Sequence, residues 1–180
     1  MLDDIRREAF NLTCMVFVWM GCLFSFNLIQ YQMKYIKGNF FTNALMLSAS
    51  EFVAVVVSGA SMQKFGLRKV LMFSFVTSAI GMLCLIHTTT SSVAVPALFV
   101  LGSKFGISQA LNLAYIGNIL LFPTSFVATS FGICNIFARI TTIFAPYLAE
   151  LKPTLISQWT FVLITVLAYF ASSAIRIKQF

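Results

Sequence analysis

Three charged side chains lie inside long apolar stretches of the sequence: Glu51, Lys104 and Arg139. An ionised group within a bilayer is costly unless it faces water or a partner, so each of the three is by default a candidate for binding a charged solute. The alternative is structural. Glu51 would pair with Lys104 or Arg139 as an inert bridge, or Lys104 would extend its ammonium group to the membrane surface. Against this alternative, Glu51 lies near the middle of its apolar stretch, too deep to reach the surface easily.

The rest of the sequence offers no pattern typical of an enzyme or a metal centre. It has no nucleophile–base pair, no phosphate-binding loop and no metal-ligand spacing, and the single histidine, His87, has no carboxylate nearby in sequence. The four cysteines show no CxxC spacing, so we expect small packing residues; they are Cys14, Cys22, Cys84 and Cys134. We therefore predict a protein that is not an enzyme, with no catalytic residues, no metal and no cofactor.

The composition predicts a membrane protein. Apolar residues make up 59% of the chain, charged residues make up 9%, and the mean hydropathy is +0.92. A soluble domain of this length could not cover so much apolar surface. The net charge of +7 does not indicate nucleic-acid binding, because the basic residues stand at the ends of apolar runs rather than in a stripe with exposed aromatic residues. The expected partner is the lipid bilayer.

Six apolar segments are long enough to cross the membrane as helices, which takes about 17 to 25 residues. A charged lead-in at residues 1–10 precedes one transmembrane domain at residues 11–180. Pro123 divides a stretch too long for one helix, and the four-residue spacing of Gly102 and Gly106 predicts close helix packing. The expected spans are about 11–33, 41–62, 70–86, 93–118, 124–148 and 155–175. We therefore predict an all-α polytopic membrane protein with both termini on one side.

Basic residues near the span ends predict which side the termini face. Seven lie on the side of the termini and three on the opposite side, so the positive-inside rule places the termini on the insertion side. That side is the cytoplasm for a plasma membrane or the matrix for an inner mitochondrial membrane, and both remain open. The seven are Arg6, Arg7, Lys64, Arg68, Lys69, Arg176 and Lys178, and the three are Lys34, Lys37 and Lys152.

The turn between the second and third expected spans carries Gly59, Lys64, Gly66, Arg68 and Lys69. This pattern resembles the loop signature of the major facilitator superfamily, Gly-(x)3-Asp-Arg-x-Gly-Arg-Arg. Four further stretches are similar to the C-terminal half of its organic cation and anion transporter family, and the match runs in register over nearly the whole chain. They are Ser50–Ala54 (family Glu-Phe-Pro-Ala), Gly102–Ser108 (Gly-Lys/Arg-x-Gly-Ile-Thr/Ser), Leu121–Thr124 (Leu-Tyr-Pro-Thr) and Gly132–Tyr147 (an Arg-Ile-Gly-Gly-(x)3-Pro-Phe pattern).

The resemblance implies one six-helix half of a carrier in which substrate binds near the bilayer midplane, between two halves that rock for alternating access. Glu51, Lys104 and Arg139 would then bind the substrate. In the family, the position of Arg139 tends to be arginine in anion carriers, so the resemblance favours a small organic anion, which Coulomb attraction in a low-dielectric cavity supports. A complete site would need a complementary six-helix half or a second copy of this chain.

Three positions depart from the family together: Gln63 replaces an aspartate, Leu120 a glutamate and Val127 an arginine. In the family these charges form a cluster that helps to hold one gating state. Losing one member would strand a charge, whereas replacing the whole set with neutral residues can be neutral or stabilising, so the gate is predicted to be degenerate. Two hypotheses follow. The chain is a degenerate half retained as a structural or accessory subunit of a larger membrane assembly, or a working half that transports a small organic anion with a partner.

Overall fold

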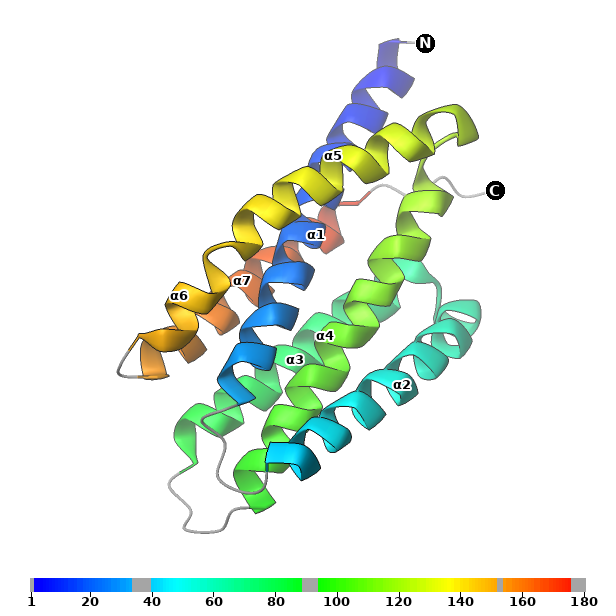
Figure 1. Ribbon diagram of the computed structural model, residues 1–180. Coiled ribbons are helices and arrows are strands. Elements are labelled where there is room, and N and C mark those ends of the chain that lie inside the picture. Colours follow the sequence, from blue (N-terminus) through cyan, green and yellow to red (C-terminus); the bar gives the residue numbers. More distant parts are fainter. Residues whose placement is uncertain (1, 34–39, 89–93, 152–153, 176–180) are drawn as a thin grey trace.

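The computed structural model describes residues 2–33, 40–88, 94–151 and 154–175 (Figure 1). Within these ranges the regular structure is entirely helical, and the predicted all-α class is confirmed. The helices are α1 (Leu2–Gln32), α2 (Phe40–Phe65), α3 (Leu67–His87), α4 (Ala94–Leu121), α5 (Thr124–Thr142), α6 (Ala145–Glu150) and α7 (Thr154–Ala174).

Six segments of the described chain are long and apolar enough to cross a membrane, as predicted. They are Arg6–Gln32, Phe41–Phe65, Leu67–His87, Val95–Leu121, Thr124–Glu150 and Leu155–Ala174. The first helix begins inside the charged lead-in, at Leu2. Pro123 precedes α5 in an extended conformation and separates it from α4, as expected for a residue without an amide donor.

The fifth span differs from the single helix expected at residues 124–148. It is interrupted after Thr142, and the short helix α6 resumes at Ala145. Pro146 explains the break: it has no N–H to donate to the carbonyl of Thr142, and its ring would clash with that carbonyl in a continuous helix. The span is therefore α5 followed by α6.

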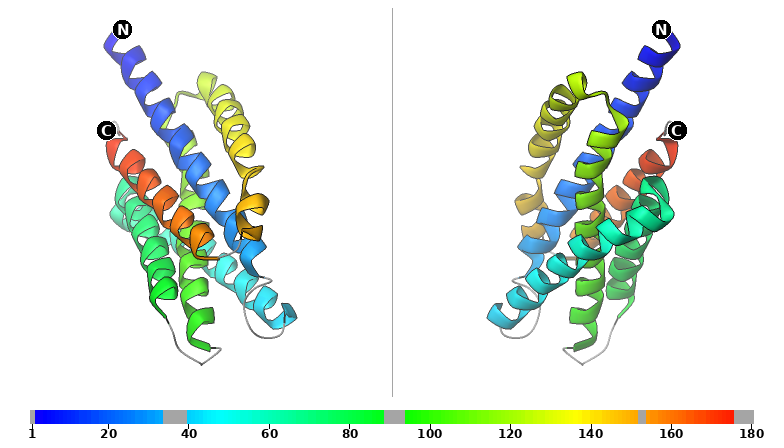
Figure 2. Two further views of the ribbon diagram at one scale, coloured as in Figure 1. Left: turned by 90° about the vertical axis from the view of Figure 1, so that its left-hand side faces the viewer. Right: turned by 90° about the vertical axis from the view of Figure 1, so that its right-hand side faces the viewer.

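The helices are arranged in two layers. In Figure 1, α5, α1, α4 and α2 form the layer nearer the viewer, and α3 and α7 lie behind them; the side views in Figure 2 show the same order. The two central spans, α1 and α4, are 61% and 56% buried, whereas the spans containing α2 and α5 are each 17% buried. We call the surface formed by α1, α2, α4 and α5 the open face.

Both ends of the described chain lie at the same end of the bundle (Figure 2). We call this the termini end. Because successive spans run in opposite directions, α2 ends there at Phe65 and α5 begins there at Thr124. The basic residues Lys34, Lys37, Lys152, Arg176 and Lys178 lie outside the described residues, so the side of the membrane remains a prediction.

Glycines bring α3 and α4 together. A Cβ atom added at Gly106 would lie 2.7 Å from the Ser74 carbonyl oxygen, and one added at Gly81 would lie 2.6 Å from Ser103 Oγ. Gly102, in contrast, has nothing within 4 Å of such an atom. Of the Gly102 and Gly106 pair, therefore, only Gly106 makes the close helix contact that the spacing predicts.

Candidate functional site

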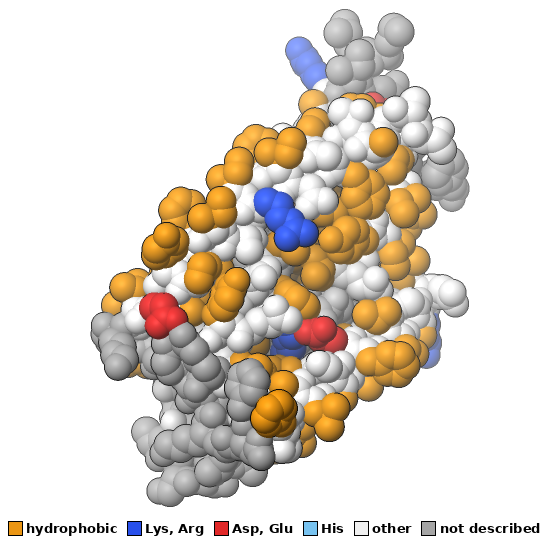
Figure 3. Space-filling model, viewed as in Figure 1, with side chains coloured by type: hydrophobic (Ala, Val, Ile, Leu, Met, Phe, Trp, Pro, Cys, Tyr) orange, Lys and Arg blue, Asp and Glu red, His pale blue; other side chains and the backbone are white. Residues whose placement is uncertain are grey.

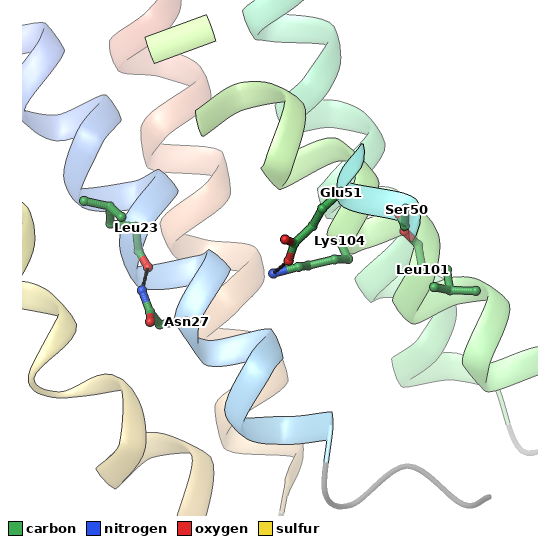
Figure 4. A network of polar contacts seen from close by, with 6 residues as sticks. All are labelled: Leu23, Asn27, Ser50, Glu51, Leu101 and Lys104. Atoms are coloured by element: carbon green, nitrogen blue, oxygen red, sulfur yellow. Dashed lines mark hydrogen bonds and ion pairs between the residues drawn. The ribbon is translucent and has the colours of Figure 1, made fainter. Parts of the chain in front are cut away.

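Glu51 and Lys104 meet inside the bundle. Glu51 projects from α2 and Lys104 from α4, and the Lys104 Nζ atom lies 2.7 Å from Glu51 Oε1. Figure 4 shows the two side chains pointing toward each other. The Lys104 side chain is fully buried, whereas that of Glu51 is 32% exposed. The pair therefore presents its carboxylate, and not its ammonium group, to the surroundings.

A third helix contributes an aromatic ring to the Lys104 ammonium. The Nζ atom lies 3.1 Å from the centroid of the Phe26 ring on α1. A cation over an aromatic face is attracted by the ring quadrupole, and the attraction is stronger when water is excluded. Sequence reasoning missed Phe26, because one phenylalanine among 20 carries no signal of its own. Lys104 thus joins α1, α2 and α4 at one point.

A cleft of about 240 Å³ borders this cluster on the open face. Its lining combines the carboxylate, two aromatic rings, two aliphatic side chains and two further polar side chains; the residues are Phe26, Glu51, Val55, Ser108, Leu111, Asn112 and Tyr115. The face drawn in Figure 3 shows an acidic and a basic side chain together near its centre, surrounded by hydrophobic atoms. The space is large enough for several water molecules or a small solute.

The polar residues of the cleft come from one face of α4. Ser108, Asn112 and Tyr115 follow one another at spacings of four and three residues, which is a helix-face pattern that the sequence already contained. Asn112 donates a hydrogen bond to the Ser58 hydroxyl on α2. Ser108 is 5% exposed, and its hydroxyl has no hydrogen-bond partner among the described residues. This hydroxyl is therefore buried beside the cleft without a partner in the described chain.

Arg139 does not join the Glu51–Lys104 pair. It is exposed on α5, and its guanidinium group makes no ion pair or side-chain hydrogen bond within the described ranges. It is the single Lys or Arg of that helix. The three predicted site residues therefore divide into a buried pair and one exposed cation. Together they leave one net positive charge on this side of the bundle.

The signature residues of the α2–α3 turn have structural contacts. Gly66 has φ of 82°, a conformation that side chains disfavour, and this allows the chain to reverse between the two helices. Arg68 donates a hydrogen bond to the Ser173 carbonyl and so joins α3 to α7. Lys64 Nζ lies 5.4 Å from the Phe65 ring, Lys69 is exposed, and Gly59 faces open space.

The three neutral positions near the termini end are not paired with charges in the described chain. Gln63 and Leu120 are exposed, and Val127 packs against the hydrophobic core. Nearby, the Ser130 hydroxyl donates a buried hydrogen bond to the Asn118 side chain and joins α5 to α4. A neutral polar contact therefore holds this junction.

Comparison with known proteins agrees with the membrane architecture. No family model matches the chain. It is 29% identical over 137 residues to a Caenorhabditis elegans protein named as a putative transporter, an alignment that covers 76% of this chain and 28% of that protein. The chain thus spans less than a third of the length of this relative. With the six apolar spans, this similarity supports a transporter-like integral membrane protein.

Proposed function

We propose that this chain is one half of a membrane carrier of the major facilitator type, similar to the organic cation and anion transporters. It would supply one wall of a solute site that a second six-helix body completes. The observation that carries this proposal is the Glu51–Lys104 pair, whose ammonium group is buried but whose partly exposed carboxylate borders a cleft on the open face.

The depth of the pair supports a binding role. Glu51 lies 14 residues before the end of α2 at Phe65, which is about 21 Å at a rise of 1.5 Å per residue. The hydrocarbon layer is about 30 Å thick, so the pair lies well inside it. Apolar residues would be as stable or more stable at such a position. A retained ion pair beside an open cleft is therefore better explained by binding than by stability.

The charges favour a small organic anion as substrate. Lys104 and Arg139 outnumber Glu51, so the open face is net positive. Arg139 is exposed and can contact an anion directly. Lys104 is buried, and its role is to neutralise and position Glu51 through the ion pair. Alternating access would come from rocking of this half against the second body.

A structural or accessory subunit is the second candidate. Neutral residues at Gln63, Leu120 and Val127 favour it, because a working gate of the family's kind needs charges there. In either case we propose that the termini face the insertion side, in a plasma membrane or an inner mitochondrial membrane.

Reconstitution tests the carrier proposal. The protein would be extracted in mild detergent with whatever co-migrates, reconstituted into liposomes, and assayed for uptake of radiolabelled benzoate as the probe anion. We expect uptake that Arg139→Ala abolishes and that Arg6→Ala, a change near the N-terminal end of α1 and away from the Glu51–Lys104 pair, leaves intact. Migration as a stoichiometric part of a large complex, with no uptake, would support the accessory role instead.

A further inference from the structure

The two edge helices of the open face carry opposite charges at similar distances along the helix from the end that lies toward the termini end. Glu51 on α2 lies 14 residues from Phe65, and Arg139 on α5 lies 15 residues from Thr124. Both helix ends are at the termini end of the bundle. At 1.5 Å per residue, the two charges are therefore about 21 and 23 Å from that end, along helices that run in opposite directions.

The two edge charges differ in how far they are paired within one chain. Arg139 is exposed and has no side-chain partner in the described parts of the protein. Glu51 is paired with Lys104 through Oε1, but its side chain is 32% exposed and borders the cleft. The central helices α1 and α4 separate the two edges (Figure 1). Because an intramembrane charge without a partner is costly, Arg139 requires a group of opposite charge from outside the chain, and the partly exposed Glu51 carboxylate of a second copy is such a group.

We propose that a second copy of this chain covers the open face, related to the first by a two-fold axis along the membrane normal. In this arrangement α2 of each copy packs against α5 of the other, and when no anion is bound Glu51 accepts hydrogen bonds from the partner copy's Arg139. Such an interface is isologous, so one self-complementary patch makes both ion pairs. The proposal rests on the proposed function, because it names the second six-helix body of the carrier.

Two glycines support the same helix pairing. Gly59 on α2 and Gly132 on α5 each have nothing within 4 Å of an added Cβ atom. They lie about 9 and 12 Å from the termini end, so they oppose one another when the charges do. Gly59 is eight residues from Glu51, and Gly132 is seven from Arg139, spacings that keep each on the helix face of its charge. Small residues allow helices to approach closely in membranes.

Disulfide crosslinking in native membranes tests the pairing. Val55→Cys and Asn135→Cys would be placed on differently tagged copies of the full chain and co-expressed. Each position is one turn nearer the termini end than its charge, at about 15 and 17 Å. The background carries Cys84→Ser, because the other three cysteines are buried. On oxidation we expect a mixed-tag dimer of twice the 20.0 kDa chain mass.

The control pair combines Val53→Cys with Asn135→Cys. Val53 and Val55 both lie on α2, and each is 49% exposed. Because they are two residues apart, their side chains project from opposite sides of the helix. We expect little mixed-tag dimer from this pair. Equal yields from the two pairs, or none from Val55→Cys with Asn135→Cys in stably expressed protein, would overturn the proposal.

Three further substitutions separate effects on the interface from effects on the fold. Gly132→Leu should abolish the Val55–Asn135 crosslink, because the added side chain has open space in one chain but meets α2 of the other copy. Gly102→Leu, which also meets open space but lies on α4, should leave the crosslink intact. Arg139→Glu should lose it through repulsion of Glu51. A crosslink unchanged by Gly132→Leu and Arg139→Glu would contradict the proposed contact.

The outcome is distinguishable from failure of the carrier proposal. If the chain purifies with a different six-helix protein and that pair takes up benzoate, the second-copy inference is wrong while the carrier function stands. If the mixed-tag dimer forms but no uptake is measured, the second copy is supported and the transport function is contradicted.

Discussion

The two edge helices of the open face hold their intramembrane charges in different ways. On α2, Glu51 is tied to Lys104 of α4, whose ammonium also lies over the Phe26 ring of α1. On α5, Arg139 stands exposed and makes no such contact within the described ranges. The α2 edge is therefore built into the single chain, whereas the α5 edge carries a charge suited to something outside it. This difference distinguishes residues that stabilise a single copy from residues that act between the chain and a second six-helix body.

The largest loss of stability is expected from removing the Glu51 carboxylate on α2. Glu51→Ala leaves the Lys104 ammonium buried without its counter-ion, which costs about 3–5 kcal/mol of stability. Thermal unfolding in detergent, followed by tryptophan fluorescence or by aggregation, measures the loss. The double substitution Glu51→Leu with Lys104→Met removes both charges and should recover most of it. Equal melting temperatures for the single and double variants would show that the pair is not the source.

Sequence reasoning was most successful for charged residues within apolar segments, because such residues are rare there. Glu51 and Lys104 stood out because a charge inside an apolar stretch needs an explanation, and the structure brings them together. The six spans were predictable for the same reason, from length and hydropathy. The break before α6 was missed, although Pro146 was visible, because the length of the span alone favoured one helix.

The rest of the site could not be predicted because its members look like ordinary membrane residues. Phe26 is one of many phenylalanines, and which of them contacts Lys104 depends on how α1 packs against α4. Ser108, Asn112 and Tyr115 share a helix face, but that spacing alone does not show whether the face borders a cleft or another helix. That Arg139 stays away from Glu51 follows from the positions of α2 and α5 on opposite edges.

Glycine substitutions sharpen the comparison between inner and edge contacts. Gly106→Ala adds a methyl group 2.7 Å from the Ser74 carbonyl oxygen, so α3 and α4 must separate, at a cost of about 1–3 kcal/mol. Gly132→Ala meets open space on α5 and should not lower the stability of a single copy. Thermal unfolding of the two variants side by side provides the measurement. Equal destabilisation would mean that the edge of α5 is as closely packed as the interior.

The aromatic contact should contribute less than the ion pair. Phe26→Leu keeps an apolar side chain of similar size but removes the ring face from the Lys104 ammonium, and we expect a loss of about 1–2 kcal/mol. Phe17→Leu is the matched control, since Phe17 is on α1 but 56% exposed. A Phe26→Leu variant no less stable than Phe17→Leu would show that Glu51 alone satisfies Lys104.

The smallest effect on stability, and the most informative about function, is expected from Arg139→Ala. In one copy the guanidinium contacts no described partner, so its removal should change the unfolding free energy by no more than about 0.5 kcal/mol. The measurement is thermal unfolding of protein in detergent at a dilution where only single copies are present by light scattering. If Arg139 acts between bodies, the same substitution should still abolish the Val55–Asn135 crosslink in membranes. A large loss of stability in single copies would instead place Arg139 among the residues that hold one chain together, and the difference between the two edges would disappear.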